Sequence, residues 1–268
     1  SVHEEWAREA HRLGWSTVKV AEEAIIDLGD LAFKGKKFQD VRTAFNHAKR
    51  EGIRAEWASY PSLPAGLKQQ VDTICQAWAD EKALPEMGFT LGGLREINDS
   101  DTRLLLALDE EERIHAVTSW MPVYSGGEVV GLTLDVMRRD DSGFRLAIDF
   151  LIGQAALLAQ DEGLQFISLS GAPLAESGQC EESSELADSR FAFAPVLDVM
   201  GSVMEPVYGF RSLLAYKKKF QVRFVPLYLA IPDIANAPAV GLAIAHAYLP
   251  NMSAISAVGV AAKLVSRD

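Results

Sequence analysis

Three consecutive β-strands are predicted for residues 103–140, and this run constrains the fold more than any other part of the chain. Apolar and β-branched residues form three stretches here, separated by a charged turn at residues 109–112 and a glycine turn at Gly126 and Gly127. Strands joined by such short turns pair in antiparallel fashion. A helix is expected from Phe144 to about Gln160, followed by strands at residues 164–172 and 222–231. The sequence therefore predicts an α/β (α+β) protein.

The N-terminal part repeats this alternation of strands and helices. One or two strands are expected at residues 16–28, a strand at 53–60, a helix at 63–83 and a strand at 87–93. Between them, Phe38, Val41, Phe45 and Ala48 recur at three and four residues, which predicts an amphipathic helix that ends at Gly52. Two similar α/β lobes are predicted, an N-terminal one at residues 1–95 and a C-terminal one at 96–268.

Charge and cysteine content narrow the function classes. The net charge is -11 and the pI is about 5.0, so extended non-specific binding of nucleic acid is not expected and any polyanion must be bound locally. Two cysteines cannot form a disulfide framework, which favours a reducing, cytosolic-side compartment. The five histidines and two cysteines show no metal-ligand spacing, and there is no P-loop or GxGxxG motif. We therefore expect no metal and no cofactor.

Residues 234–262 contain no Asp, Glu, Lys or Arg. Pro238, Pro250 and Asn251 interrupt this stretch, so it predicts two short apolar helices, each too short to cross a bilayer of about 30 Å. Such helices pack in a core or touch lipid, and both interpretations stay open. The chain starts at Ser1 without a signal peptide, which favours a piece excised from a longer protein.

Asp135 is the first candidate for a functional side chain. It interrupts the apolar alternation of a predicted central strand, where an acid needs a partner or a chemical role. Arg138 would point to the opposite face of a regular strand. Both can share a site only if the strand bulges or ends at Met137. A structural ion pair elsewhere is the alternative.

Two basic segments are candidates for binding an anion. A polar stripe with helical spacing follows Lys37, and a run of lysines precedes the last predicted strand. Either could instead be a solvated surface. The candidate residues are Arg42, Asn46 and Lys49 in the stripe, and Lys217, Lys218, Lys219 and Arg223 in the lysine-rich segment.

Five motifs in order resemble one known family. They are KGKKFQDVRTAFNHAKREG, MGFTLGG, LDVMRRD, LSGAPLA and YKKKFQVRFVPLYLAIP, and together they span nearly the whole chain. The chain resembles the soluble C-terminal catalytic domain of the aminoacyl-phosphatidylglycerol synthases, also called multiple peptide resistance factors, which include the lysyl-phosphatidylglycerol synthases. The resemblance implies two tandem GNAT-like acyltransferase lobes, each a mixed sheet flanked by helices. It also implies transfer of an aminoacyl group from aminoacyl-tRNA to a glycerol hydroxyl of phosphatidylglycerol.

The resemblance also implies roles for single residues. Asp135 would orient and polarise the hydroxyl or hold the substrate amine, and Arg138 would meet a phosphate or the developing oxyanion. Lys217 and Lys219 would hold the lipid phosphate or the tRNA terminus. Phe224 and Leu227 stand where the family commonly has Trp and Arg, so Arg223 could take over a substrate contact. For Arg42, Asn46 and Lys49 only a binding role is carried over.

The expected partners are the acceptor end of aminoacyl-tRNA, phosphatidylglycerol, and an N-terminal membrane domain in the full-length protein, which places the activity at the cytoplasmic face of the cell membrane. Between Arg138 and Arg145 the chain has one glycine and two acids. Such a loop is poorly suited to binding the pyrophosphate of a CoA thioester, which agrees with a tRNA ester as donor. Lysine is preferred over alanine as the transferred amino acid. The alternatives are a same-fold aminoacyltransferase with another lipid or peptide acceptor, and a non-enzymatic lipid-binding domain.

Overall fold

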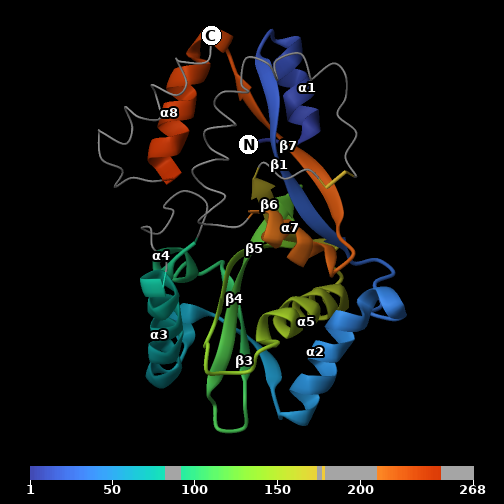
Figure 1. Ribbon diagram of the computed structural model, residues 1–268, viewed down its shortest axis with the longest axis vertical. Coiled ribbons are helices and arrows are strands. Elements are labelled where there is room, and N and C mark those ends of the chain that lie inside the picture. Colours follow the sequence, from blue (N-terminus) through green and yellow to red (C-terminus); the bar gives the residue numbers. More distant parts are fainter. Residues whose placement is uncertain (82–91, 174–176, 179–209, 249–268) are drawn as a thin grey trace.

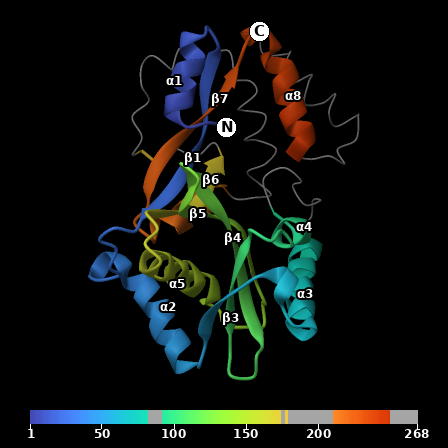
Figure 2. The ribbon, with the colours of Figure 1, turned by 180° about the vertical axis from the view of Figure 1, so that it is seen from behind.

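A computed structural model of the 268-residue chain describes residues 1–81, 92–173, 177–178 and 210–248. The described residues form one seven-stranded mixed sheet flanked by helices (Figures 1 and 2). The strands are β1 (Ser16–Asp27), β2 (Arg54–Ala58), β3 (Arg103–Leu108), β4 (Ile114–Ser125), β5 (Glu128–Arg139), β6 (Phe166–Pro173) and β7 (Arg223–Ile231). The helices are α1 (Glu4–Arg12), α2 (Gln39–Arg50), α3 (Ala65–Glu81), α4 (Leu94–Ile97), α5 (Ala147–Asp161), α7 (Phe210–Lys218) and α8 (Ala237–Tyr248), with 3-10 turns at Lys36–Phe38, Tyr60–Ser62 and Ile234–Asn236.

The strand order in the sheet is β2-β3-β4-β5-β6-β1-β7. Neighbouring strands run antiparallel except β5 and β6, which run parallel and are connected through α5. The parallel pairing is short, because it joins only Gly131, Leu132 and Thr133 of β5 to β6. Beyond Thr133, β5 continues to Arg139 without β6 beside it.

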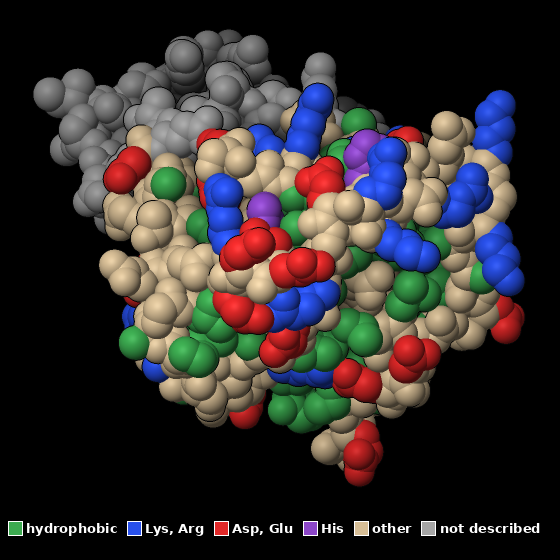
Figure 3. Space-filling view, turned by 90° about the horizontal axis from the view of Figure 1, so that it is seen from below, with side chains coloured by type: hydrophobic (Ala, Val, Ile, Leu, Met, Phe, Trp, Pro, Cys, Tyr) green, Lys and Arg blue, Asp and Glu red, His purple; other side chains and the backbone are tan. Residues whose placement is uncertain are grey.

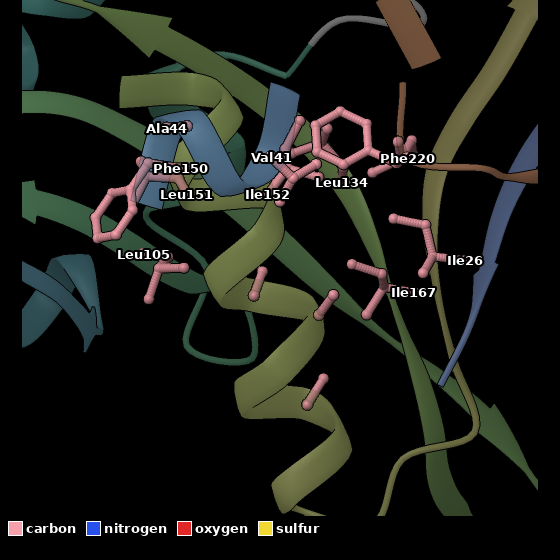
Figure 4. Close-up of a cluster of buried hydrophobic side chains, with 14 of the residues drawn as sticks. Ile26, Val41, Ala44, Leu105, Leu134, Phe150, Leu151, Ile152, Ile167 and Phe220 are labelled. Atoms are coloured by element: carbon pink, nitrogen blue, oxygen red, sulfur yellow. The ribbon is translucent and has the colours of Figure 1, made fainter. Parts of the chain in front are cut away.

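Each face of the sheet carries its own hydrophobic core. One face is covered by α2 and α5, and Figure 4 shows their apolar side chains directed at residues of β1, β3, β5 and β6. The other face is covered by α3, whose Val71, Ile74 and Cys75 pack on apolar residues of β3, β4 and β5. Fully burying one such side chain contributes about 1.5–3 kcal/mol. The sheet is thus fixed from both sides around β5.

The amphipathic pattern after Lys37 forms α2 as predicted. Val41 and Ala48 are buried, and the Phe45 ring meets the Phe150 ring of α5 edge to face, with 6.0 Å between the ring centroids. Gly153 of α5 allows this approach, because a Cβ at that position would lie 2.7 Å from Cζ of Phe45.

Most of the predicted elements are present. The three-stranded meander, the helix after residue 144, the helix after Pro61 and the strands β1, β2, β6 and β7 are confirmed, and so is the mixed α/β class. Helix α1 was not predicted. Most of the strand expected at residues 87–93 and the second apolar helix lie outside the described residues. The division into GNAT-like lobes at residue 95 stays a prediction; the sheet combines β1 and β2 with strands from beyond it.

The apolar segment after residue 234 forms α8 in its first half. Within the part of the chain that the structure describes, each helix is too short or too polar to cross a bilayer.

Candidate functional site

A β-bulge in β5 brings Asp135 and Arg138 to the same face of the sheet. Leu134 pairs with Trp120 and Met137 pairs with Thr118, so β5 has one residue more than β4 between these pairs. The sequence reasoning required such a bulge if the two side chains were to share a site. The N–H of Val136 donates to the buried Oγ of Ser119 at 2.9 Å, which holds the extra residue in place.

The packing shows the effect of the bulge on side-chain direction. Leu132 and Leu134 belong to the core under α5, whereas Val136 belongs to the core under α3, and Met137 returns to the α5 side. Asp135 contacts Gly92, which precedes α4, and Arg138 lies against Trp78 of α3. Figure 1 shows α3 and α4 together on one side of the sheet. Asp135 and Arg138 therefore both face the α3 and α4 side.

Among the described residues, the carboxylate of Asp135 has one hydrogen-bonded oxygen and one buried oxygen without a hydrogen bond. The N–H of Gly92 donates to Oδ1 at 3.0 Å, while the buried Oδ2 has no hydrogen-bond partner in the described structure. Burial raises the pKa of Asp135 and the nearby Glu96 adds to this, whereas the Gly92 N–H and the charge of Arg138 oppose it. Asp135 is therefore a more basic carboxylate than usual, with one oxygen available to accept a proton or hydrogen bond.

Arg138 is 5% exposed, and its guanidinium lies over the face of an aromatic ring. Its Cζ is 3.4 Å from the centre of the Trp78 ring, and Nη1 donates to the Met137 carbonyl at 3.0 Å. Attraction between the guanidinium and the ring face limits the positions that the guanidinium can take. Arg138 therefore places a positive charge at a fixed position beside α3.

A cavity of about 1,210 Å³ lies at the end of β5 and is lined by α3, the β5–α5 connection, α5 and α7. It extends between elements on both faces, where β6 no longer pairs with β5. Five basic and three acidic side chains line it, in a protein with a net charge of -11. These are Arg113, Arg138, Arg139, Arg145 and Lys219, with Asp140, Asp141 and Asp149. The cavity therefore carries a net positive charge in an acidic protein, which favours the binding of an anionic substrate.

Lys219 and Tyr216 line the same cavity from α7 and the turn that follows it. The Nζ of Lys219 lies 3.2 Å from Oδ2 of Asp149 and 4.7 Å from the centre of the Tyr216 ring. Burial, with the neighbouring Asp149, raises the pKa of Tyr216, so its hydroxyl stays protonated. The structure therefore brings Arg138 and Lys219, two of the predicted residues, to one cavity.

Lys217 does not line this cavity. It is 3% exposed, and its Nζ donates to the carbonyls of Ser170 and Gly171 at 2.9 and 3.1 Å. Burial lowers the pKa of the Lys217 ammonium to about 7, although the charge of Glu23 opposes this shift. The geometry directs Lys217 to the interior, and its expected phosphate contact stays a prediction.

The other predicted binding residues lie outside the cavity. Arg223 on β7 forms an ion pair with Asp27, with 2.7 Å between Nη2 and Oδ1. Arg42, Asn46 and Lys49 lie on α2. On the face shown in Figure 3, basic side chains gather toward one edge, the side where Figure 1 places α2, and acids and bases mix over the centre. Their binding role stays a prediction.

Sequence reasoning did not identify Gly92, Trp78 and Arg145 as functional candidates. Gly92 stands in the MGFTLGG motif, and the structure explains its second-last glycine: a Cβ there would lie 1.6 Å from Oδ2 of Asp135. A glycine within a strand-like motif indicates that another group approaches the backbone closely, so the sequence alone could have pointed to Gly92. Trp78 had no comparable signal, because its contact with Arg138 depends on the bulge.

The sequence of this chain is similar to a family of known proteins. The family described as phosphatidylglycerol lysyltransferase, C-terminal, matches residues 1–231. An uncharacterized protein of Corynebacterium glutamicum is 46% identical over 93% of this chain and 30% of its own length. A protein of Nocardia farcinica named lysylphosphatidylglycerol biosynthesis bifunctional protein LysX is 26% identical over 93% of this chain and 22% of its own. The chain thus spans less than a third of these relatives.

Two solved structures share the fold. L-PGS from Bacillus licheniformis matches with a TM-score of 0.72 and 22% identity, over 92% of this chain and 71% of that one. The C-terminal domain of a putative lysylphosphatidylglycerol synthetase from Agrobacterium fabrum matches with a TM-score of 0.71 and 21% identity, over 94% and 72%. At this level of identity the likeness concerns the fold.

Proposed function

The chain belongs to the family of phosphatidylglycerol lysyltransferase C-terminal domains, and from this premise we propose that it transfers an aminoacyl group from aminoacyl-tRNA to the glycerol hydroxyl of phosphatidylglycerol. The observation that carries the proposal is the bulge of β5. It turns a carboxylate with a buried, unpaired oxygen to the same side as Arg138, a buried arginine that lines a cationic cavity. The cavity has room for a charged ester and an anionic acceptor, since ligand sites typically occupy about 300–1,000 Å³.

The reaction exchanges one ester for another. The glycerol hydroxyl oxygen attacks the acyl carbon, a new C–O bond forms, and the bond from that carbon to the tRNA ribose oxygen breaks. The proton of the glycerol hydroxyl ends on the ribose oxygen. Such an exchange needs a group that receives the proton and donors that stabilise the oxyanion on the acyl carbon.

We assign the first task to Asp135 and the second to Arg138. The unpaired Oδ2 of Asp135 accepts the hydroxyl hydrogen, and the raised pKa of the carboxyl makes it a stronger base than an exposed aspartate. The guanidinium of Arg138, fixed on Trp78, donates to the oxyanion or to a phosphate. Lys219 and the arginines of the cavity favour the tRNA terminus and the lipid phosphate.

The amino acid, the membrane context and the partners belong to the same proposal. We prefer lysine, with alanine next, and place the reaction at the cytoplasmic face of the membrane, beside an N-terminal membrane domain of the full-length protein. Phosphatidylglycerol as acceptor supports this location, because its head group lies at the membrane surface. A transferase with another lipid or peptide acceptor, and a lipid-binding domain without activity, are the rivals.

The test is transfer of labelled amino acid from charged tRNA into phosphatidylglycerol liposomes, with lysine, alanine and arginine compared. Transfer of one amino acid that is abolished by Asp135→Ala and falls about 100- to 1,000-fold with Arg138→Ala supports the assignment. Arg12→Ala is the matched control, because Arg12 is exposed on α1. Liposome binding without transfer from any donor would reject the transferase assignment. Label in an added peptide or another lipid would move it to that acceptor.

A further inference from the structure

A connected set of hydrogen bonds links the interior of the sheet to the bulge that carries Asp135. It begins at Lys217, whose Nζ donates to the Ser170 and Gly171 carbonyls of β6 at 2.9 and 3.1 Å. It ends at Leu134, whose carbonyl accepts a hydrogen bond from the hydroxyl of Ser170. Leu134 is the last residue of β5 in register with β4 before the bulge. Ser170 thus joins β6 to β5 just beyond the end of their parallel pairing.

Ser170 has a backbone conformation that serine seldom adopts. Its φ is 64°, in the left-handed region where glycine is the usual residue. Such a conformation persists only where the surroundings determine it, and it concentrates at functional sites. Here three contacts determine it: the Ser170 N–H donates to Oγ of Ser168 at 3.0 Å, the Ser170 hydroxyl donates to Leu134, and the Ser170 carbonyl accepts from Lys217.

The surroundings of Lys217 explain why an amine is buried there. Ser168 is fully buried and donates to Glu23 of β1, whose other carboxylate oxygen lies 2.6 Å from Nε2 of His3. The charge of Glu23 favours the ammonium form of Lys217, and the two carbonyls take up its N–H groups. Burying this amine costs desolvation free energy. The buried amine in turn fixes the carbonyl of Ser170 through a hydrogen bond.

We propose that Lys217 is a positioning residue, which acts through Ser170 on the bulge of β5 and thereby sets the direction of Asp135. This inference rests on the proposed function, because it gives the bulge a catalytic purpose. Lys217 holds the Ser170 carbonyl, the left-handed turn aims the Ser170 hydroxyl at Leu134, and Leu134 fixes the start of the bulge. In this role Lys217 acts through Ser170 and not by contact with the substrate or the reacting atoms.

The kinetic test compares the full chain with Lys217→Met, Ser170→Gly and the double variant. Methionine keeps the length of the side chain without its donors, and glycine keeps the left-handed conformation without the hydroxyl. Each single variant should lower kcat by about 10- to 100-fold, because a displacement of about 1 Å costs on this scale, with KM for both substrates within about twofold. The kcat of the double variant should equal the kcat of the less active single variant. Losses of kcat that multiply in the double variant, or a change in KM without a change in kcat, would overturn the proposal.

A second measurement does not depend on transferase activity. The Val136 amide, bonded to Ser119 inside the bulge, reports on the bulge through its hydrogen exchange, measured by NMR. In Lys217→Met it should exchange at least about 10-fold faster, while the amide of Leu106 in β3 keeps its rate. Lys218→Met is the matched control, because Lys218 is the exposed neighbour, and it should change neither amide. An unchanged exchange rate of the Val136 amide in Lys217→Met would refute the positioning role, whether or not the chain transfers an amino acid. A chain that transfers no amino acid but shows the faster exchange would reject only the proposed function.

Discussion

Replacing Gly92 by alanine should remove activity by displacing the carboxylate of Asp135. A Cβ at this position would lie 1.6 Å from Oδ2 and 2.4 Å from Cγ of Asp135, whereas an ordinary C···O contact is about 3.3 Å or more. The carboxylate must therefore retreat by more than about 1 Å, and its 3.0 Å bond from the Gly92 N–H is strained or lost. We expect kcat to fall about 100-fold or more, which corresponds to about 2.7 kcal/mol of barrier.

The assay is the transfer of labelled amino acid into phosphatidylglycerol liposomes under steady-state conditions. Gly93→Ala is the matched control, because Gly93 has a φ of -130° that any residue adopts. If Gly92→Ala acts only through Asp135, it should add nothing to the loss caused by Asp135→Ala. A Gly92→Ala enzyme that keeps kcat within about threefold of the parent, or a loss that multiplies with that of Asp135→Ala, would refute the reasoning.

Three further outcomes are expected. Trp78→Leu, which removes the ring under Arg138, should lower kcat/KM by about 2- to 30-fold in the same assay, whereas Trp78→Phe keeps a ring face and most of the activity. Lys217 has a pKa of about 7 when folded and about 10.4 when unfolded, so the unfolded chain binds more protons between these values and the free energy of unfolding rises with pH there, by about 4 kcal/mol. Urea unfolding from pH 7 to 10 should show this rise for the parent and for Lys218→Met but not for Lys217→Met; equal profiles for all three would contradict it. Gly153→Ala should lower the free energy of unfolding by about 1–3 kcal/mol in urea, because its methyl group overlaps a phenylalanine ring of α2, and a gain from helix propensity alone would show that the contact is loose.

Local patterns predicted most of the elements because their causes are local. The period of apolar residues after Lys37 places Val41 and Ala48 in the core, and the turns at residues 109–112 and Gly126 separate the strands of the meander. Helix α1 escaped prediction although Glu4 and Arg8 are spaced for an i,i+4 ion pair, which they form.

The candidate site was predicted only in part, because its geometry depends on contacts distant in sequence. Asp135 and Arg138 were identified, but alternation alone puts them on opposite faces, and only the register with β4 shows the bulge. The lysines of YKKKF look alike in sequence. Helical geometry separates them: Lys217 points to the interior, Lys218 is exposed and Lys219 reaches the cavity.

The position of β1 in the sheet has a consequence for synthesis of the protein. β1 is made before both of its neighbours in the sheet, β6 and β7, and β7 ends at Ile231. A ribosome that adds about 5–20 residues per second leaves β1 without either neighbour for on the order of ten seconds, with its unpaired backbone N–H and C=O groups and its apolar side chains available to other chains. Slow induction together with a chaperone that shields nascent strands should therefore raise the soluble yield. Chains truncated before β7 should aggregate even though α2, α3 and the meander are complete.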